Sequence, residues 1–128
     1  MRRDLAHAVD DLVARDTVLA ELMERHGPCR LPGPRPAGGR FEALTRSICG
    51  QQVAGAAARA IHGRFLGLYD GAPTPEVVLA THPDDLRGVG LSGAKAASIV
   101  NLASLVDDGD VRLSTLGRYD DDRVVEQL

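Results

Sequence analysis

The stretch that decides the fold runs from Phe41 to Ile61 and reads Phe-Glu-Ala-Leu-Thr-Arg-Ser-Ile-Cys-Gly-Gln-Gln-Val-Ala-Gly-Ala-Ala-Ala-Arg-Ala-Ile. In its first half, Phe41, Leu44 and Ile48 recur at helical spacing. A Gly50-Gln51-Gln52 break follows, and then a long helix whose small side chains let a neighbouring helix approach closely. We therefore predict two helices joined by a short polar turn. The predicted buried stripe of the second helix consists of Val53, Ala56, Ala57, Ala60, Ile61, Phe65 and Leu68.

The helical period continues upstream of this stretch. Apolar residues at helical spacing predict a helix over roughly residues 3–15, and Asp16 is a plausible N-cap for a second one. Gly27-Pro28 would stop that second helix. Residues 27–39 contain four prolines and four glycines, so we expect a loop or tether there.

Downstream, three further helix starts are recognisable. Thr74-Pro75-Glu76 combines a cap candidate, a first-turn proline and an early acid, and His82-Pro83 begins a short element ending at Gly88. Ser92 can cap a helix that stops at Asp107-Asp108-Gly109, and Asp120 to Asp122 open a last one. No period-two run of strand length occurs, so we predict an all-α bundle of about seven or eight helices that forms a single region over 1–128. The apolar face of the helix after Ser92 consists of Ala96, Ile99, Leu102, Ala103 and Val106.

The composition is that of a globular protein, with 44% hydrophobic and 26% charged residues in 128. Aromatic residues make up only 3%, so the core must consist of Leu, Val, Ile and Ala. No apolar run is long enough to cross a bilayer and the N-terminus has no signal core, so we expect a cytoplasmic protein. Cys29 and Cys49 form no CxxC pair. We therefore expect no metal and no cofactor, with one loop thiol and one buried cysteine.

The net charge of −3 argues weakly against a general nucleic-acid binder, but the charges are unevenly distributed. Residues 25–64 carry seven arginines (25, 30, 35, 40, 46, 59 and 64) against one acid, Glu42. Residues 65–128 carry five basic and eleven acidic side chains. The basic stretch can meet phosphates while the rest stays acidic. The alternative is that these arginines form an ordinary solvated face.

Three segments resemble one family. The Phe41–Ile61 stretch is similar to the F-x-x-L-x-x-x-I-x-x-Q-Q pattern and alanine-rich helix of DNA-3-methyladenine glycosylase II and its relatives, in the helix-hairpin-helix superfamily. Leu86-Arg-Gly-Val-Gly-Leu-Ser-Gly-Ala-Lys-Ala-Ala-Ser-Ile-Val resembles that family's L-x-x-x-G-L-S-x-x-K-A-x-x-I block. Asp108-Gly-Asp-Val-Arg-Leu-Ser-Thr-Leu and Asp122-Arg-Val-Val-Glu-Gln-Leu resemble the stretch leading into its hairpin. The likeness runs from about Leu12 to Leu128.

The resemblance implies an enzyme that hydrolyses the N-glycosidic bond of alkylated bases in double-stranded DNA during base excision repair. Such an enzyme swings the damaged nucleotide out of the stack, and a side chain must occupy the gap. The resemblance places Gln52 at the wedge position and Gln51 beside it. Arg46, one of the arginines of the basic stretch, is a further candidate DNA contact. An amide carries donors and an acceptor that can replace lost base-pair hydrogen bonds. The alternative is that both glutamines bond only the loop backbone.

A second candidate DNA contact lies at Gly88-Val89-Gly90, with Ser92 and Lys95 just beyond. Its glycine spacing mimics a helix-hairpin-helix, whose turn presents backbone N–H groups to a phosphate. It is either that hairpin or an upstream turn that shares the spacing, and its distance from the Gln-Gln block favours the upstream turn. An exposed, solvated Lys95 is the plainer alternative.

The family's hairpin and catalytic aspartate would follow the last block, so the resemblance places both beyond Leu128. That carboxylate would stabilise positive charge on the sugar or activate water. We do not assign this role to Asp107, Asp108 or Asp110, which resemble a solvated helix end. We therefore expect a truncated chain that has no glycosylase activity by itself. The alternatives are a non-catalytic, damage-sensing DNA-binding module and a helical interaction domain.

Overall fold

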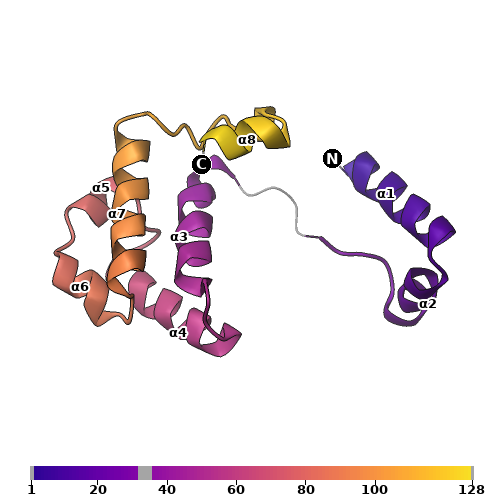
Figure 1. Ribbon diagram of the computed structural model, residues 1–128, viewed down its shortest axis with the longest axis horizontal. Helices are drawn as coiled ribbons and strands as arrows, with labels where there is room; N and C mark the ends of the chain where they lie inside the picture. Colours follow the sequence, from indigo (N-terminus) through magenta and orange to yellow (C-terminus); the bar gives the residue numbers. More distant parts are fainter. Residues whose placement is uncertain (1, 32–35, 128) are drawn as a thin grey trace. The chain divides into compact units, whose positions relative to one another are not determined.

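The structure is a computed structural model that describes residues 2–31 and 36–127, with only the backbone at residues 2–4 and 37. The described residues form eight α-helices, two short 3-10 segments and no strand, which confirms the predicted all-α class (Figure 1). The helices are α1 (Arg2–Arg15), α2 (Thr17–His26), α3 (Arg40–Gly50), α4 (Gly55–Leu66), α5 (Pro75–Leu79), α6 (Pro83–Gly88), α7 (Gly93–Asp107) and α8 (Asp121–Gln127).

The chain divides into two compact units, Met1–Gly33 and Pro34–Leu128, with the boundary inside the predicted proline- and glycine-rich segment. The first unit is the α1–α2 pair. Asp16 caps α2 as predicted, because its Oδ1 accepts from the N–H groups of Val18 at 2.9 Å and Leu19 at 3.1 Å. Gly27 ends α2 with a φ of 84°. The prediction of one region over 1–128 stays a prediction.

The second unit contains the core. Helix α7 packs against α5, α3 and α6, and α3 also packs against α4. The buried residue of the short helix α5 is Val78, and the buried residues of α7 are Ala96, Ile99 and Ala103. Leu102 and Val106 of the predicted α7 face are half-buried. The side chains that are completely shielded from solvent are Thr45, Cys49, Phe65, Val78, Leu86, Ile99 and Ala103.

The predicted buried stripe of α4 is largely wrong. Of its seven members only Ile61 and Phe65 are buried, whereas the three alanines are exposed and Val53 and Leu68 are 38% and 39% exposed. These residues are exposed because the core covers only the second half of α4, which begins at Gly55. The first two turns of α4 therefore present an alanine-rich surface to solvent.

The remaining helix boundaries follow the predicted signals. Pro75 and Pro83 each open a helix, and Ser92 caps α7 by accepting from the Lys95 N–H at 3.3 Å. Cys49 is buried and Cys29 is exposed, as predicted for the two thiols. In the described part of the chain, no helix combines the length and the apolar character needed to cross a membrane.

Candidate functional site

The turn after α3 carries both predicted wedge residues. Helix α3 ends at Gly50, where the Gln51 N–H donates to the Ile48 carbonyl at 3.3 Å. Gln51 and Gln52 are both exposed. Among the described residues, Gln52 is the one non-glycine with positive φ, at 54°. Backbone in this region is costly for a residue with a Cβ and is concentrated at functional turns. The fold thus holds the Gln52 side chain at the tip of a turn between two helices.

Helix α4 starts three residues after Gln52 without a side-chain cap, because its N-cap residue is Ala54. The first N–H groups of a helix have no partner within it and carry partial positive charge. A Cβ built on Gly55 would lie 3.5 Å from an Arg59 guanidinium nitrogen, so Arg59 folds back over the first turn of α4. A cationic side chain and free N–H groups therefore lie beside the glutamine turn.

A groove of about 730 Å³ runs between α3 and α4, and we call it the α3–α4 groove. It begins near the glutamine turn, at Gly50 and Gly55, and continues to Leu66. Arg46 and Arg59 are both exposed along it. Its lining consists of Glu42, Ala43, Arg46, Ser47, Gly50, Gly55, Ala58, Arg59, His62, Gly63 and Leu66.

His62 is the buried titratable group of this groove, with 8% of its surface exposed. Its Nε2 atom is shielded from solvent and has no hydrogen-bond partner among the described residues. Burial lowers the pKa of the imidazole; nearby Glu42 opposes this shift and Arg46 adds to it. His62 is therefore neutral at pH 7, and the positive charge of the groove comes from Arg46 and Arg59.

A second groove, of about 340 Å³, lies between α3 and α7 and includes Gln51. Ser47 lines both grooves, so α3 forms the ridge that separates them and the glutamine turn lies at the end of that ridge. The lining of this second groove consists of Leu44, Ser47, Ile48, Gln51, Ser98, Asn101, Leu102 and Leu105.

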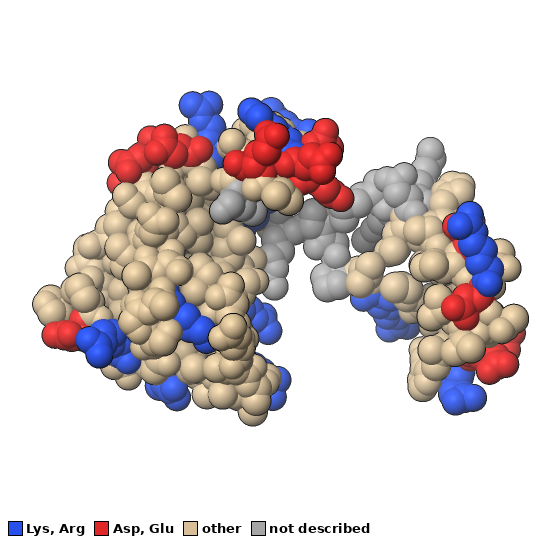
Figure 2. Space-filling model, viewed as in Figure 1, with Lys and Arg blue, Asp and Glu red and all other residues tan. Residues whose placement is uncertain are grey.

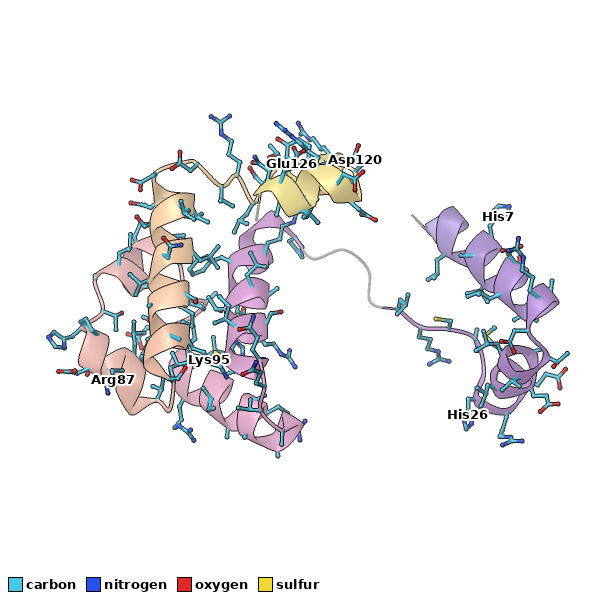
Figure 3. The ribbon with its side chains drawn as sticks, in the orientation of Figure 1. His7, His26, Arg87, Lys95, Asp120 and Glu126 are labelled. Atoms are coloured by element: carbon cyan, nitrogen blue, oxygen red, sulfur yellow. The ribbon has the colours of Figure 1, made fainter. Side chains whose placement is uncertain are left out.

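Lys95 and Ser92 lie close to the glutamine turn but are engaged in structural contacts. Lys95, labelled in Figure 3, is half-buried. Its ammonium group donates to the Cys49 carbonyl at 2.9 Å. Ser92 is exposed, and its hydroxyl caps α7. Lys95 is thus not the solvated lysine of the plainer alternative. A DNA contact of Ser92 or Lys95 stays a prediction.

Within the described part of the second unit, the arginines of the basic stretch have different roles. Arg40 donates to the Leu113 carbonyl, and Arg64 Nε donates to the Val89 carbonyl at 2.9 Å in the turn between α6 and α7. Both arginines therefore connect elements of the fold. Arg25 and Arg30 belong to the other unit, and Arg35 lies outside the described residues.

Charge nevertheless separates along the second unit. In Figure 2 the coloured side chains around α4 are mostly basic, whereas acids gather where α7 ends and α8 lies. Asp107 and Asp108 are exposed there, and Asp108 accepts a hydrogen bond from Ser104. Helix α7 has 15 residues and is about 22 Å long, so these acids lie far from the glutamine turn.

Two solved structures are similar in fold to this chain. The 3-methyladenine DNA glycosylase of Schizosaccharomyces pombe, solved in complex with abasic DNA, matches 94% of this chain with a TM-score of 0.84 and 24% identity. The DNA-3-methyladenine glycosidase of Bacillus halodurans matches 91% with a TM-score of 0.74 and 31% identity. The chain has the fold of the 3-methyladenine DNA glycosylases. It spans 60% and 53% of these two proteins. No family model and no curated protein sequence matches it.

Within this 3-methyladenine DNA glycosylase fold, the structure brings together three of the predicted site residues. Gln51, Gln52 and Arg46 all belong to α3 or its terminal turn, and Arg46 lines the α3–α4 groove. Sequence reasoning did not select Arg59 or His62 for the site. Arg59 could have been found from its position four residues after Gly55, the first residue of α4. Residues i and i+4 share a helix face, so Arg59 lies on the same face as the first residue of the helix. No sequence pattern indicated His62.

Proposed function

We propose that the protein is a base-excision repair glycosylase that hydrolyses the N-glycosidic bond of alkylated purines in DNA, acting in the cytoplasm. The observation that carries this proposal is the exposed Gln51–Gln52 turn, with Gln52 in a left-handed conformation beside Arg46 and Arg59. The similarity to two solved 3-methyladenine DNA glycosylases supports it.

In this proposal Gln52 enters the duplex where the damaged nucleotide leaves the stack. Unstacking and unpairing cost a few kcal/mol, and the inserted amide offsets part of that cost by bonding the unpaired partner base. Arg46 and Arg59 neutralise backbone phosphates on the side of the α3–α4 groove. The exposed alanines of α4 leave room for the sugar-phosphate backbone to approach the helix closely.

Hydrolysis is proposed for the protein as a whole, because the chain spans little more than half of the two similar glycosylases. Water bonds to the sugar carbon and releases a proton, while the bond to the base breaks and its electron pair leaves with the base. A carboxylate that stabilises the developing positive charge would assist this step. We assign that role to none of the described acids; the acids that gather at the end of α7 and on α8 lie away from the glutamine turn (Figure 2).

The test is fluorescence anisotropy with a duplex that carries a tetrahydrofuran abasic-site analogue and with an intact duplex of the same sequence. We expect the native chain to prefer the abasic duplex. Gln52→Ala should weaken binding to the abasic duplex by about fivefold to tenfold, the equivalent of one or two hydrogen bonds, and should leave binding to the intact duplex unchanged. Arg46→Ala should weaken binding to both duplexes and lower the salt slope by about 1. Arg112→Ala, which removes an exposed charge at the far end of α7, is the control.

Equal binding to both duplexes, unchanged by Gln52→Ala, would remove the basis for the wedge role. Base release from a methylated duplex, measured with the longest polypeptide that the gene encodes, separates an enzyme from a damage-sensing module. Absence of all DNA binding would leave a helical interaction domain.

A further inference from the structure

We propose that Lys95 is a positioning residue for the Gln51–Gln52 turn, holding the end of α3 so that Gln52 is presented in one fixed orientation. This inference rests on the proposed function, because it assigns to Lys95 the preparation of the wedge.

The contact lies at the point where α3 becomes the turn. The Lys95 ammonium group donates to the Cys49 carbonyl at 2.9 Å, although the two residues are 46 positions apart. Cys49 precedes Gly50, the last residue of α3, and α3 has no basic residue of its own in its last turn. The last carbonyls of a helix lack partners within it, and a cation beside them is favourable. Lys95 thus supplies from α7 the C-terminal cation that α3 does not contain.

Lys95 itself is firmly held. It lies in the first turn of α7, where its N–H donates to the Ser92 hydroxyl, and it is followed directly by buried Ala96. Its side chain is half-buried between α7 and α3. The cation lies close to the fully buried Cys49: burial raises the pKa of the Cys49 thiol, and the Lys95 charge opposes that shift. The ammonium group is therefore anchored to the core.

The turn requires such an anchor. Gln52 adopts a φ of 54°, a conformation that persists only where the surroundings impose it. Gly50 lies between the anchored carbonyl and the turn, and glycine restricts the backbone least. Without Lys95, the last turn of α3 keeps its internal helix bonds and the Gln51 N–H to Ile48 carbonyl bond, but the Cys49 carbonyl loses the side-chain donor that ties this end to α7. The last turn of α3 would then fray, and Gln52 would sample several orientations.

The first experiment needs no DNA. Amide hydrogen exchange is measured by NMR on the full chain and on Lys95→Met, Lys95→Arg and Arg112→Met, the last as a matched loss of one exposed charge. We expect Lys95→Met to speed exchange at Gln51 by more than about tenfold, as for loss of a charged hydrogen bond, with Ile99 unaffected. Lys95→Arg should restore protection. If Lys95→Met fails to fold, Lys95→Gln takes its place. Unchanged exchange at Gln51 would overturn the proposal.

The second experiment is a double-mutant cycle on binding to the abasic duplex. We expect Lys95→Met to weaken binding by about fivefold, and Gln52→Ala to have almost no further effect in that background. Additive effects, or a salt slope lowered by about 1 in Lys95→Met, would show a direct phosphate contact and overturn the positioning role. If the native chain does not bind the duplex, the proposed function fails, and the exchange experiment alone decides the role of Lys95.

Discussion

Single side chains that bind backbone carbonyls connect the elements of the second unit. Arg64 reaches the Val89 carbonyl between α6 and α7, and Arg40 reaches the Leu113 carbonyl after α7. Hydrogen bonds from charged donors contribute more than neutral ones, about 1.5–3 kcal/mol each. Two of the seven arginines of the basic stretch, Arg40 and Arg64, therefore serve the fold.

A substitution at Gly90 would test the contact of Arg64 with the turn between α6 and α7. It has a φ of 98°, and a Cβ there would lie 2.9 Å from an Arg64 guanidinium nitrogen. Gly71 also has positive φ, at 121°, but a Cβ there meets nothing within 4 Å. We expect Gly71→Ala and Gly90→Ala each to cost about 1–3 kcal/mol in backbone strain in urea unfolding, with a small excess at Gly90, where the end of the flexible Arg64 side chain must shift. The excess should vanish in an Arg64→Ala background, and an excess that persists would contradict this account.

His62 predicts a pH dependence of stability. Burial lowers its pKa in the folded protein below the ordinary value of about 6.5, so the unfolded chain takes up the proton first. The stability that the neutral imidazole contributes is complete above pH 6.5 and is lost as pH falls through the folded pKa. The free energy of unfolding should therefore decrease over that interval, and His62→Leu should flatten the decrease. His26→Leu, on the exposed end of α2, is the control; an equal effect of both would contradict the prediction.

At the scale of elements, the sequence predicted helix boundaries better than helix faces. The caps at Asp16 and Ser92 and the prolines at 75 and 83 act within one turn, so local sequence identifies them. The exposed alanines of α4 were predicted to be buried because residue spacing identifies an apolar helix face. It does not show how far along that face a neighbouring helix packs. The contacts of Arg40, Arg64 and Lys95 were invisible because their partner is a backbone carbonyl, which every residue possesses.

Helix α5 has only five residues and depends on burial for its stability. Val78 is fully buried, whereas its neighbour Val77 is 41% exposed. We expect Val78→Ala to lower the free energy of unfolding by about 2 kcal/mol, because it removes buried methyl groups and leaves a cavity. Val77→Ala, the same chemical change one residue earlier, should cost less than about 0.5 kcal/mol. Equal losses measured by urea denaturation would show that α5 does not pack against α7 as described.

At the scale of the whole molecule, the two units differ in how they are stabilised. Among the residues whose side chains the structure describes, every buried one lies between Phe41 and Leu113, and none of residues 5–31 is buried. The core, the glutamine turn and both grooves therefore belong to Pro34–Leu128.

This distribution predicts that a polypeptide of residues 34–128 folds by itself. We expect its thermal unfolding, followed by circular dichroism, to remain cooperative, because it retains the complete core. It should also bind the abasic duplex in a Gln52-dependent way. Residues 1–33 alone should show little cooperative unfolding, since short helices are marginal without tertiary packing. Loss of cooperativity in 34–128 would show that the core needs the first unit.

Lys95 is the only lysine in the sequence. A reagent that modifies amines therefore has a single side-chain target in this protein, and that target is the group bonded to the end of α3. Reductive methylation with isotopically labelled formaldehyde would place one reporter beside the Cys49 carbonyl without any engineered substitution. Its resonance would follow the glutamine turn directly, in the free protein and when a duplex is added.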